Sequence, residues 1–333
     1  MKSQLFAPMP VVEATTASPR PFWSVMIPSY NSAALLVRAL ESVLAQDEGP
    51  DQMQIEVVDD ASTQGEAADV VDRVGRGRVG YYRQPRNVGA TANFTTCVRR
   101  SRGVWVHLLH SDDLVKPGFY EAYQEAITCC PDALMIAAQT FLVDADEQKL
   151  GVTQPVDAES GYMKNAALMI ATSNPLRCVS VVVARRAYEQ LGGFHPGLFH
   201  ANDWEMWARV ANAGPVAWVG EPKGLYRSHP ESHTSRLHRS TAYLGDCVAA
   251  VEVMAGHFSD PKQRALARIG GRRVVADYAL HVAGQLVGQN AYRTAVANVA
   301  RAVRISPSAG TSRRAAQVLR VAVARRVGLT HIQ

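Results

Sequence analysis

Short apolar runs alternate with amphipathic stretches through the first part of the chain. Residues 23–27 form an apolar run that stops at Pro28, and apolar positions then recur at helical spacing as far as Leu44. The alternation continues with predicted strands at 54–58, 79–83 and 104–109 and predicted helices at 66–74 and 90–100. Such alternation predicts an α/β fold with an open, mostly parallel sheet flanked by helices.

The second part of the chain is less regular. Residues 151–175 give no clear assignment, and almost everything after Ser240 reads as helix. Breaks in this helical region are predicted at Gly270-Gly271 and at 306–308. The other predicted elements are a helix at 117–129, a strand at 133–141, a strand at 176–183, a helix at 203–213 and a strand at 216–219.

Composition and charge narrow the class of protein. The chain has 333 residues, of which 47% are hydrophobic, and it has no apolar run near the roughly 20 residues of a membrane-spanning helix. Five cysteines without ligand spacing disfavour a disulfide framework or a structural zinc site, so we expect the cytoplasm as the compartment. The charge is lopsided: residues 261–333 carry 13 basic residues against Asp277 alone, whereas residues 1–260 carry 22 basic and 29 acidic residues.

Two adjacent carboxylates, Asp112 and Asp113, follow the strand predicted at 104–109. Neighbouring carboxylates repel each other unless a cation or a donor lies between them, and Mg²⁺ or Mn²⁺ prefers such oxygen ligands. An alternative is a capped, solvated turn before the next helix. Because Asp59-Asp60 and the segment 28–31 also follow strands, and ligands bind beyond the carboxyl ends of parallel strands, we favour the metal site.

Five ordered motifs then resemble family 2 glycosyltransferases, the inverting nucleotide-sugar enzymes of GT-A fold. The resemblance covers roughly residues 22–236 and implies transfer of a sugar from a nucleoside diphosphate sugar to an acceptor hydroxyl, assisted by a divalent cation. The motifs are SVMIPSYN, VVDDAST, RNVGATANFTTCVRRSRGVWVHLLHSDD, GGF with NDWEMWAR, and YRSH.

The resemblance implies a domain organisation. Residues 1–21, rich in proline, are expected to form a disordered lead-in. Residues 22–240 are expected to form the GT-A domain, with a nucleotide-binding half at 22–113 and an acceptor and catalytic half at 114–240. Residues 241–333 are expected to form a basic α-helical extension.

The resemblance also implies roles for donor-binding residues. It places Pro28, Tyr30 and Asn31 in the nucleotide pocket, Asp60 on the base or ribose, and Asn87 and Gly89 in a loop beside the nucleotide.

For the cation, the resemblance implies Asp113 as a ligand and Asp112 as a ligand to the metal or the ribose. His229 falls where relatives present a histidine or basic residue to the metal or diphosphate, although a plain loop role is an alternative. The usual signature is Asp-x-Asp-Asp, and here its first position is His110.

Asp203 is the candidate catalytic base. Inversion is a single displacement, so a carboxylate must take the proton from the attacking hydroxyl. The resemblance places Asp203 where relatives carry an acidic pair, whose first member is here Asn202. A helix N-cap role for Asp203 is an alternative that does not exclude catalysis.

The expected reaction adds one sugar per encounter, because the QxxRW motif and membrane helices of processive relatives are absent. Two other functions remain open. One is a catalytically silent nucleotide-sugar binder, which the replacements at His110 and Asn202 make plausible. The other is a sugar-phosphate nucleotidyltransferase, which is disfavoured because PSYNSAALL lacks the required Gly-rich, basic loop.

The basic C-terminal stretch 311–329 sets arginines around a modest apolar face. Such a helix can lie on an anionic membrane surface, in a peripheral position on the inner face of the membrane. The expected acceptor is a saccharide or a lipid-linked molecule, and membrane attachment would suit the second. Packing on the catalytic domain is the alternative. Nucleic acid is not expected as a partner, since no aromatic residues lie among the arginines.

Overall fold

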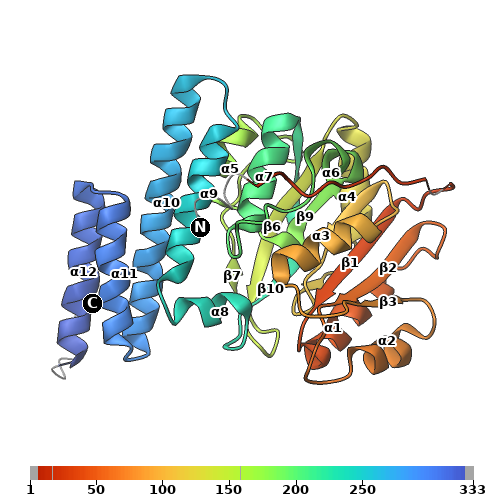
Figure 1. Cartoon of the computed structure of the whole chain (residues 1–333), viewed down its shortest axis with the longest axis horizontal. Helices are drawn as coiled ribbons and strands as arrows, with labels where there is room; N and C mark the ends of the chain where they lie inside the picture. Colours follow the sequence, from red (N-terminus) through yellow and green to blue (C-terminus); the bar gives the residue numbers. More distant parts are fainter. Residues whose placement is uncertain (1–6, 17, 158, 327–333) are drawn as a thin grey trace. The chain divides into compact units, whose positions relative to one another are not determined.

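The computed structural model describes residues 7–16, 18–157 and 159–326 (Figure 1). The chain divides into two compact units. The first, called the sheet domain below, comprises the residues up to Ala167 and Pro175–His229. The second, called the helical unit, comprises Leu168–Asn174 and the residues from Pro230 onward. The helical unit therefore includes a short segment from the middle of the chain, which differs from the single boundary predicted between residues 240 and 241.

Four parallel strands in the order β3-β2-β1-β4 form the first half of the sheet domain, as the alternating pattern predicted (Figure 1). Helices connect each strand to the next. The elements are β1 (Trp23–Ser29), α1 (Ala33–Leu44), β2 (Met53–Asp59), α2 (Ala67–Gly75), β3 (Gly80–Arg83), α3 (Ala90–Arg100) and β4 (Trp105–Leu108).

β1 continues through Pro28, where the sequence predicted its end. The pairing of β1 with β4 stops at Met26 and Leu108, whereas the pairing with β2 continues past Pro28, which lies opposite Val58. A proline cannot donate a ladder hydrogen bond, and it is tolerated where one side of the strand has no partner. Pro28 is therefore a buried strand residue.

The second half of the sheet domain mixes strand directions. β9 lies antiparallel between β4 and β6, and β10 runs parallel to β6 and far longer than predicted, with an irregularity between Val219 and Gly224. The strand predicted from residue 176 begins with the 3₁₀ turn η2 instead. The elements are β5 (Leu114–Val115), α4 (Phe119–Cys129), β6 (Met135–Val143), β7 (Lys149–Val152), β8 (Gly161–Tyr162), η2 (Cys178–Ser180), β9 (Val181–Ala184), α6 (Arg185–Leu191), α7 (Asn202–Ala213) and β10 (Val216–Arg227).

A cluster of buried apolar side chains joins the sheet to α1, α2 and α4. The helical spacing of apolar residues that predicted α1 brings Leu36, Leu40 and Val43 into this cluster. Burial of such side chains contributes roughly 25 cal/mol per Å² of apolar surface. Other members of the cluster include Trp23, Ile27, Val57, Val70, Phe119, Tyr123 and Ile136.

The described part of the predicted disordered lead-in packs on the sheet domain. Val12 is 2% exposed, and three backbone carbonyls of this segment accept hydrogen bonds: Pro10 from the Gly193 N–H, Val11 from Arg99 and Glu13 from Arg185. These contacts hold residues 10–13 against the sheet domain, within the segment for which the sequence predicts a disordered lead-in. Residues 1–6 and 17 lie outside the described residues.

In the helical unit, α10 runs unbroken through Gly270 and Gly271, where the sequence predicted a break. A Cβ at Gly270 would lie 2.6 Å from the Thr172 side chain, and one at Gly271 would lie 2.8 Å from Val251. The glycines therefore permit close helix packing rather than ending the helix. The predicted break at 306–308 is confirmed. The helices are α5 (Ala166–Ser173), α8 (His233–His238), α9 (Ala242–Gly256), α10 (Pro261–Gly288), α11 (Tyr292–Ile305) and α12 (Ala309–Arg326).

Within the described residues, no helix combines the length and the hydropathy needed to cross a lipid bilayer.

Substitution of Gly103 tests how closely the segment before β4 approaches the backbone of β1. A Cβ there would lie 2.6 Å from both Ser24 N and Trp23 C, which are backbone atoms that cannot rotate away. We expect Gly103→Ala to lower the free energy of unfolding by about 1–3 kcal/mol in urea denaturation, as overpacking does. Gly151→Ala is the control, because its Cβ meets nothing within 4 Å, and equal stability of both variants would contradict the close approach.

Candidate active site

The loops that follow β1 and β4 meet at the carboxyl edge of the parallel strands. Ser32 Oγ lies 3.1 Å from Ser29 Oγ and 2.7 Å from Ser111 Oγ, so a chain of hydroxyl hydrogen bonds links the two loops. Asn31 adds the loop after β2: its backbone N–H donates to Ser62 Oγ at 2.9 Å. Three strand ends that are far apart in sequence therefore form one edge, as the sequence predicted.

Asn31 has a positive φ of 51°, which asparagine tolerates better than most residues. Its Oδ1 accepts the backbone N–H groups of Thr63 and Gln64 at 2.8 and 3.0 Å. The Asn31 side chain therefore holds the β2 loop, while the neighbouring Tyr30 side chain is 39% exposed at the same edge. Pro28 lies below them inside β1.

Asp59 and Asp60 are both buried and have separate partners. Asp59 pairs with Arg83, at 2.6 Å from Nη1 to Oδ2. Asp60 accepts the backbone N–H groups of Val88 and Gly89 at 2.7 and 2.9 Å. Burial raises the pKa of Asp60, against these two hydrogen bonds.

The loop before α3 is built around Asp60. Asn87 Nδ2 donates to the Asp60 carbonyl at 3.1 Å, and Gly89, with φ of 86°, precedes the first residue of α3. A positive φ favours glycine at this position. The structure therefore brings together three residues that the resemblance assigned to donor binding, and it gives the Asp60 carboxylate a loop-holding role that sequence reasoning missed.

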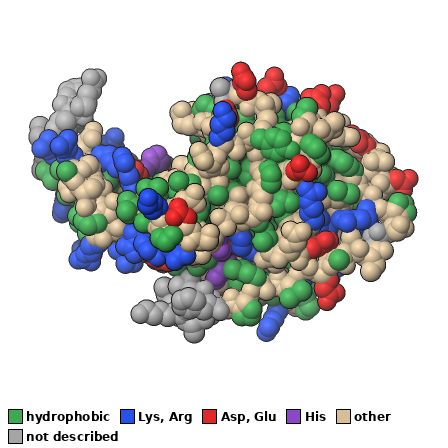
Figure 2. Space-filling model, turned by 90° about the horizontal axis from the view of Figure 1, so that it is seen from above, with side chains coloured by type: hydrophobic (Ala, Val, Ile, Leu, Met, Phe, Trp, Pro, Cys, Tyr) green, Lys and Arg blue, Asp and Glu red, His purple; other side chains and the backbone are tan. Residues whose placement is uncertain are grey.

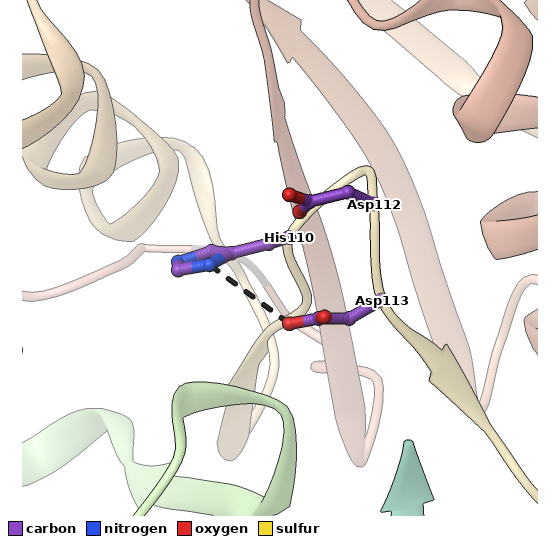
Figure 3. A group of neighbouring side chains, drawn as sticks. All are labelled: His110, Asp112 and Asp113. Carbon is purple, nitrogen blue, oxygen red and sulfur yellow. Dashed lines mark ion pairs between the residues drawn. The ribbon is translucent and has the colours of Figure 1, made fainter. Parts of the chain in front are cut away.

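His110, Asp112 and Asp113 form a cluster just beyond β4 (Figure 3). One possible ligand atom from each residue lies within 4.8 Å of the others, and His110 Nδ1 is 4.0 Å from Asp113 Oδ2. Figure 3 shows both carboxylates directed to the side on which the imidazole lies. His110, which replaces an acid of the usual signature, thus shares the site with the aspartates.

The polar atoms of this cluster fit a divalent cation. Asp113 Oδ1 accepts the Arg227 backbone N–H at 3.0 Å, but the buried Asp113 Oδ2 and His110 Nε2 have no hydrogen-bond partner among the described residues. Buried polar atoms are usually paired, and an unpaired one indicates a missing water or ion. Carboxylate oxygens and an imidazole nitrogen are suitable donors to Mn²⁺ and similar ions.

The two adjacent aspartates have opposite pKa shifts. Burial and the charge of Asp112 raise the pKa of Asp113 well above its usual range. Burial also acts to raise the pKa of Asp112, but the hydrogen bond with His229 and the nearby charge of His110 lower it overall. His229 Nε2 lies 3.2 Å from Asp112 Oδ2, so the predicted metal residue His229 does reach the carboxylate pair.

Asp203 lies in the first turn of α7, and its Oδ1 accepts the Trp204 N–H at 2.7 Å. The helix begins one residue earlier than predicted, so Asp203 is inside it and the cap position belongs to Ala201. Burial raises the pKa of Asp203, which the Trp204 hydrogen bond and the charges of His110 and Arg177 oppose. Asp203 is therefore close enough to the His110 cluster to interact with it electrostatically.

Two residues of this site were missed by sequence reasoning. The positive charge of Arg177 acts to lower the pKa of both Asp113 and Asp203, against the larger effect of burial. Phe94 of α3 stacks on the His110 imidazole, with ring centroids 5.0 Å apart. Phe94 lies in the same quoted motif as His110, but the motif gave no signal that the two rings would stack, and Arg177 lies outside the motifs.

Comparisons with known proteins agree with this geometry. Residues 24–189 match the family model described as Glycosyl transferase family 2. Chondroitin synthase of Escherichia coli is 24% identical over 219 residues, which are 63% of this chain. The chain spans only 29% of the length of that enzyme.

Two solved structures share the fold. Staphylococcus aureus TarS 1–349 in complex with UDP-GlcNAc has a TM-score of 0.60 at 15% identity, and the match covers 93% of each chain. The mannosyltransferase PcManGT of Pyrobaculum calidifontis, in complex with GDP-Man and Mn²⁺, has a TM-score of 0.53 at 18% identity. That match covers 99% of this chain and 88% of PcManGT. The neighbours identify the sheet domain as GT-A like, as predicted.

Replacement of Asp60 tests its hold on the loop before α3. Asp60→Asn keeps the shape of the side chain but directs an NH₂ group at a backbone donor, so we expect the free energy of unfolding to fall by about 1–3 kcal/mol. The amides of Val88 and Gly89 should exchange faster with solvent deuterium than in the wild type. Asp72→Asn, on the exposed side of α2, is the control, and unchanged exchange at Val88 and Gly89 in the Asp60 variant would contradict the role.

Proposed function

Because the chain belongs to glycosyl transferase family 2, we propose that it is an inverting, metal-dependent enzyme that moves one sugar from a nucleoside diphosphate sugar to an acceptor hydroxyl. The observation that carries this proposal is the cluster of His110, Asp112 and Asp113, in which the buried Asp113 Oδ2 lacks a partner among the described residues.

The donor nucleotide would bind along the edge formed by the loops after β1 and β2. Tyr30 is exposed there and available to the base, while Asn31 ties the loop after β1 to the loop after β2 by hydrogen bonds. Asp60 would act on the base or ribose chiefly by placing Asn87 and Gly89, whose loop it holds. Pro28 would shape the floor of the pocket from within β1.

Asp113 and Asp112 would hold the divalent cation, Mn²⁺ or Mg²⁺, and His229 would assist through its contact with Asp112. The bound cation would offset the charge that develops on the leaving diphosphate. Arg177 adds a positive charge near the same carboxylates, so it would stabilise that diphosphate as well.

Asp203 would accept the proton of the acceptor hydroxyl as that oxygen attacks the anomeric carbon. Burial raises the pKa of Asp203, so its carboxylate would hold a proton more strongly than an ordinary aspartate does. The charges of His110 and Arg177 act on the Asp203 carboxylate, which supports a role for Asp203 in the same site. Burial of the site would exclude competing water.

The biosynthesis of a surface polysaccharide or glycolipid is the role we propose. Relatives support this class of product, since chondroitin synthase and the succinoglycan biosynthesis protein ExoO of Rhizobium meliloti both match the chain. The UDP-GlcNAc and GDP-Man complexes of the structural neighbours support a nucleotide-sugar donor.

Replacement of Asp203 separates catalysis from binding. We expect Asp203→Asn to lower kcat by 10²–10⁴-fold, since a general base contributes about that factor, while donor affinity stays within about twofold. Release of nucleoside diphosphate gives the rate, and calorimetry with UDP- and GDP-sugars gives the affinity. Glu125→Gln on the exposed side of α4 is the matched control and should behave as wild type.

Two results would count against this mechanism. Undiminished turnover by Asp203→Asn would remove Asp203 as the base. Donor binding by the wild-type protein without any turnover across a broad acceptor panel would instead favour a nucleotide-sugar binding protein.

We also propose that the C-terminal helices bind an anionic membrane surface. No acidic residue follows Asp277, and the ion pair of that residue is with Arg314. On α12, Leu319 and Val323 are exposed beside Arg320 and Arg326. Figure 2 shows basic side chains, drawn in blue, among hydrophobic ones on the left of the view, over these helices. Residues 327–329 of the predicted basic stretch lie outside the described residues.

Liposome binding tests the membrane proposal. Each basic residue near an anionic surface contributes about 1 kcal/mol, so the triple change of Arg313, Arg320 and Arg326 to Gln should weaken sedimentation with phosphatidylserine liposomes by roughly 100-fold. The same change at Arg73, Arg76 and Arg86, exposed arginines of the sheet domain, is the charge-matched control. Equal loss in both variants, or equal binding to neutral liposomes, would contradict a specific surface on these helices.

A further inference from the structure

We infer that His110 is a protein ligand of the cation and that its nitrogen makes the site select Mn²⁺ and other borderline metal ions over Mg²⁺. This inference rests on the proposed function in one respect, the presence of a cation at Asp112 and Asp113. It goes further because it assigns a role to the residue that departs from the usual acidic signature.

The distances permit ligation by His110. Metal–nitrogen and metal–oxygen bonds are about 2.0–2.2 Å long, so two atoms bound to one ion are at most about 4.4 Å apart. His110 Nδ1 and Asp113 Oδ2 are 4.0 Å apart, and the whole set of three ligand atoms lies within 4.8 Å. If the side chains moved by a few tenths of an ångström, all three ligand atoms could bind one ion. Figure 3 shows the three side chains gathered on one side of the loop.

The surroundings hold the imidazole in this place. Phe94 stacks on the His110 ring at 5.0 Å between centroids and 23° between planes, and Phe94 in turn packs against the buried Phe194. A ligand held in position by packing loses little entropy when it binds an ion. Asp113 is fixed independently, since the Arg227 backbone N–H occupies its Oδ1 and leaves Oδ2 facing the imidazole.

The chemistry of the donor set then determines which ion is preferred. Mg²⁺ favours oxygen ligands in near-octahedral geometry and keeps several waters, whereas imidazole suits transition metals. An aspartate at position 110 would give three carboxylates and a stronger pull on Mg²⁺. Histidine removes one negative charge and adds a nitrogen donor, and both changes favour the transition metal.

A charged His110 is the rival arrangement. An imidazolium at 4.0 Å from Asp113 could neutralise that carboxylate directly, and the site would then need no ion. Ligation by His110 predicts tight binding of Mn²⁺, whereas a charged His110 predicts none. A titration of the protein with metal ions therefore separates the two arrangements.

Electron paramagnetic resonance of free Mn²⁺ measures the affinity, with Mg²⁺ as the competitor, first with the metal alone and then with UDP or GDP present. We expect wild-type protein to prefer Mn²⁺ and His110→Asp to lower the ratio of Mn²⁺ to Mg²⁺ affinity by at least about tenfold, because a carboxylate that suits Mg²⁺ replaces the nitrogen donor. His110→Asn supplies an oxygen without a new charge and should lower the ratio in the same direction. If His110→Asp does not fold, His110→Asn alone tests the ligand assignment.

Two control variants test whether a change in the ratio of Mn²⁺ to Mg²⁺ affinity comes from ligation by His110. His229→Gln should weaken both ions by similar factors, because His229 contacts Asp112 rather than completing the set with Asp113. His281→Asp, on the exposed side of α10, repeats the change of charge away from the site and should change nothing.

The outcomes are distinguishable from failure of the proposed function. An unchanged ratio in both His110 variants, with sugar transfer intact, would overturn the ligand assignment and leave the function standing. Sugar transfer without any Mn²⁺ binding, alone or with nucleotide, would overturn it in favour of the imidazolium arrangement. Absence of donor binding and of transfer while the Mn²⁺ preference persists would overturn the function and leave the ligand assignment standing.

Discussion

The buried carboxylate of Asp113 connects the two halves of the sheet domain. It follows β4, at the end of the parallel half of the sheet, and it accepts the backbone N–H of Arg227 at the end of β10. The Arg227 side chain returns to the Asp112 carbonyl at 2.8 Å and to the Ala145 carbonyl at 2.8 Å. One arginine therefore fixes both the backbone and the side chain of the acidic loop.

This connection extends to α1 through Glu147. Arg227 and Arg38 both pair with the Glu147 carboxylate, at 3.1 and 2.9 Å. Their hydrogen bonds, that of Arg38 foremost, lower the pKa of Glu147 to about 2. The exposed Arg38 gains only a modest free energy from its pair. Arg227 is buried, and its hydrogen bonds set the position of the loop that carries Asp112.

The site uses carboxylates for different purposes according to their partners. Asp59 and Asp60 face positive or donor groups of the protein, which satisfies them within the fold. Asp113 keeps one buried oxygen without a partner among the described residues, and a buried charge in that condition is costly unless a ligand compensates it. The difference between the two aspartate pairs is the physical basis for placing the cation at the second pair.

The sequence by itself determined the alternation of strands and helices, the strand ends on which the acidic residues lie, and the family motifs, because periodicity and short motifs are local properties of the chain. Tertiary structure decided the rest. The sequence predicts a helix break at Gly270 and Gly271. In the structure these glycines instead allow Thr172 and Val251 to pack closely on the helix. The stacking of Phe94 on His110 and the hold of the Asp60 carboxylate on the Val88-Gly89 loop exist only in the folded chain. The free energy of such contacts depends on partners that no local pattern specifies.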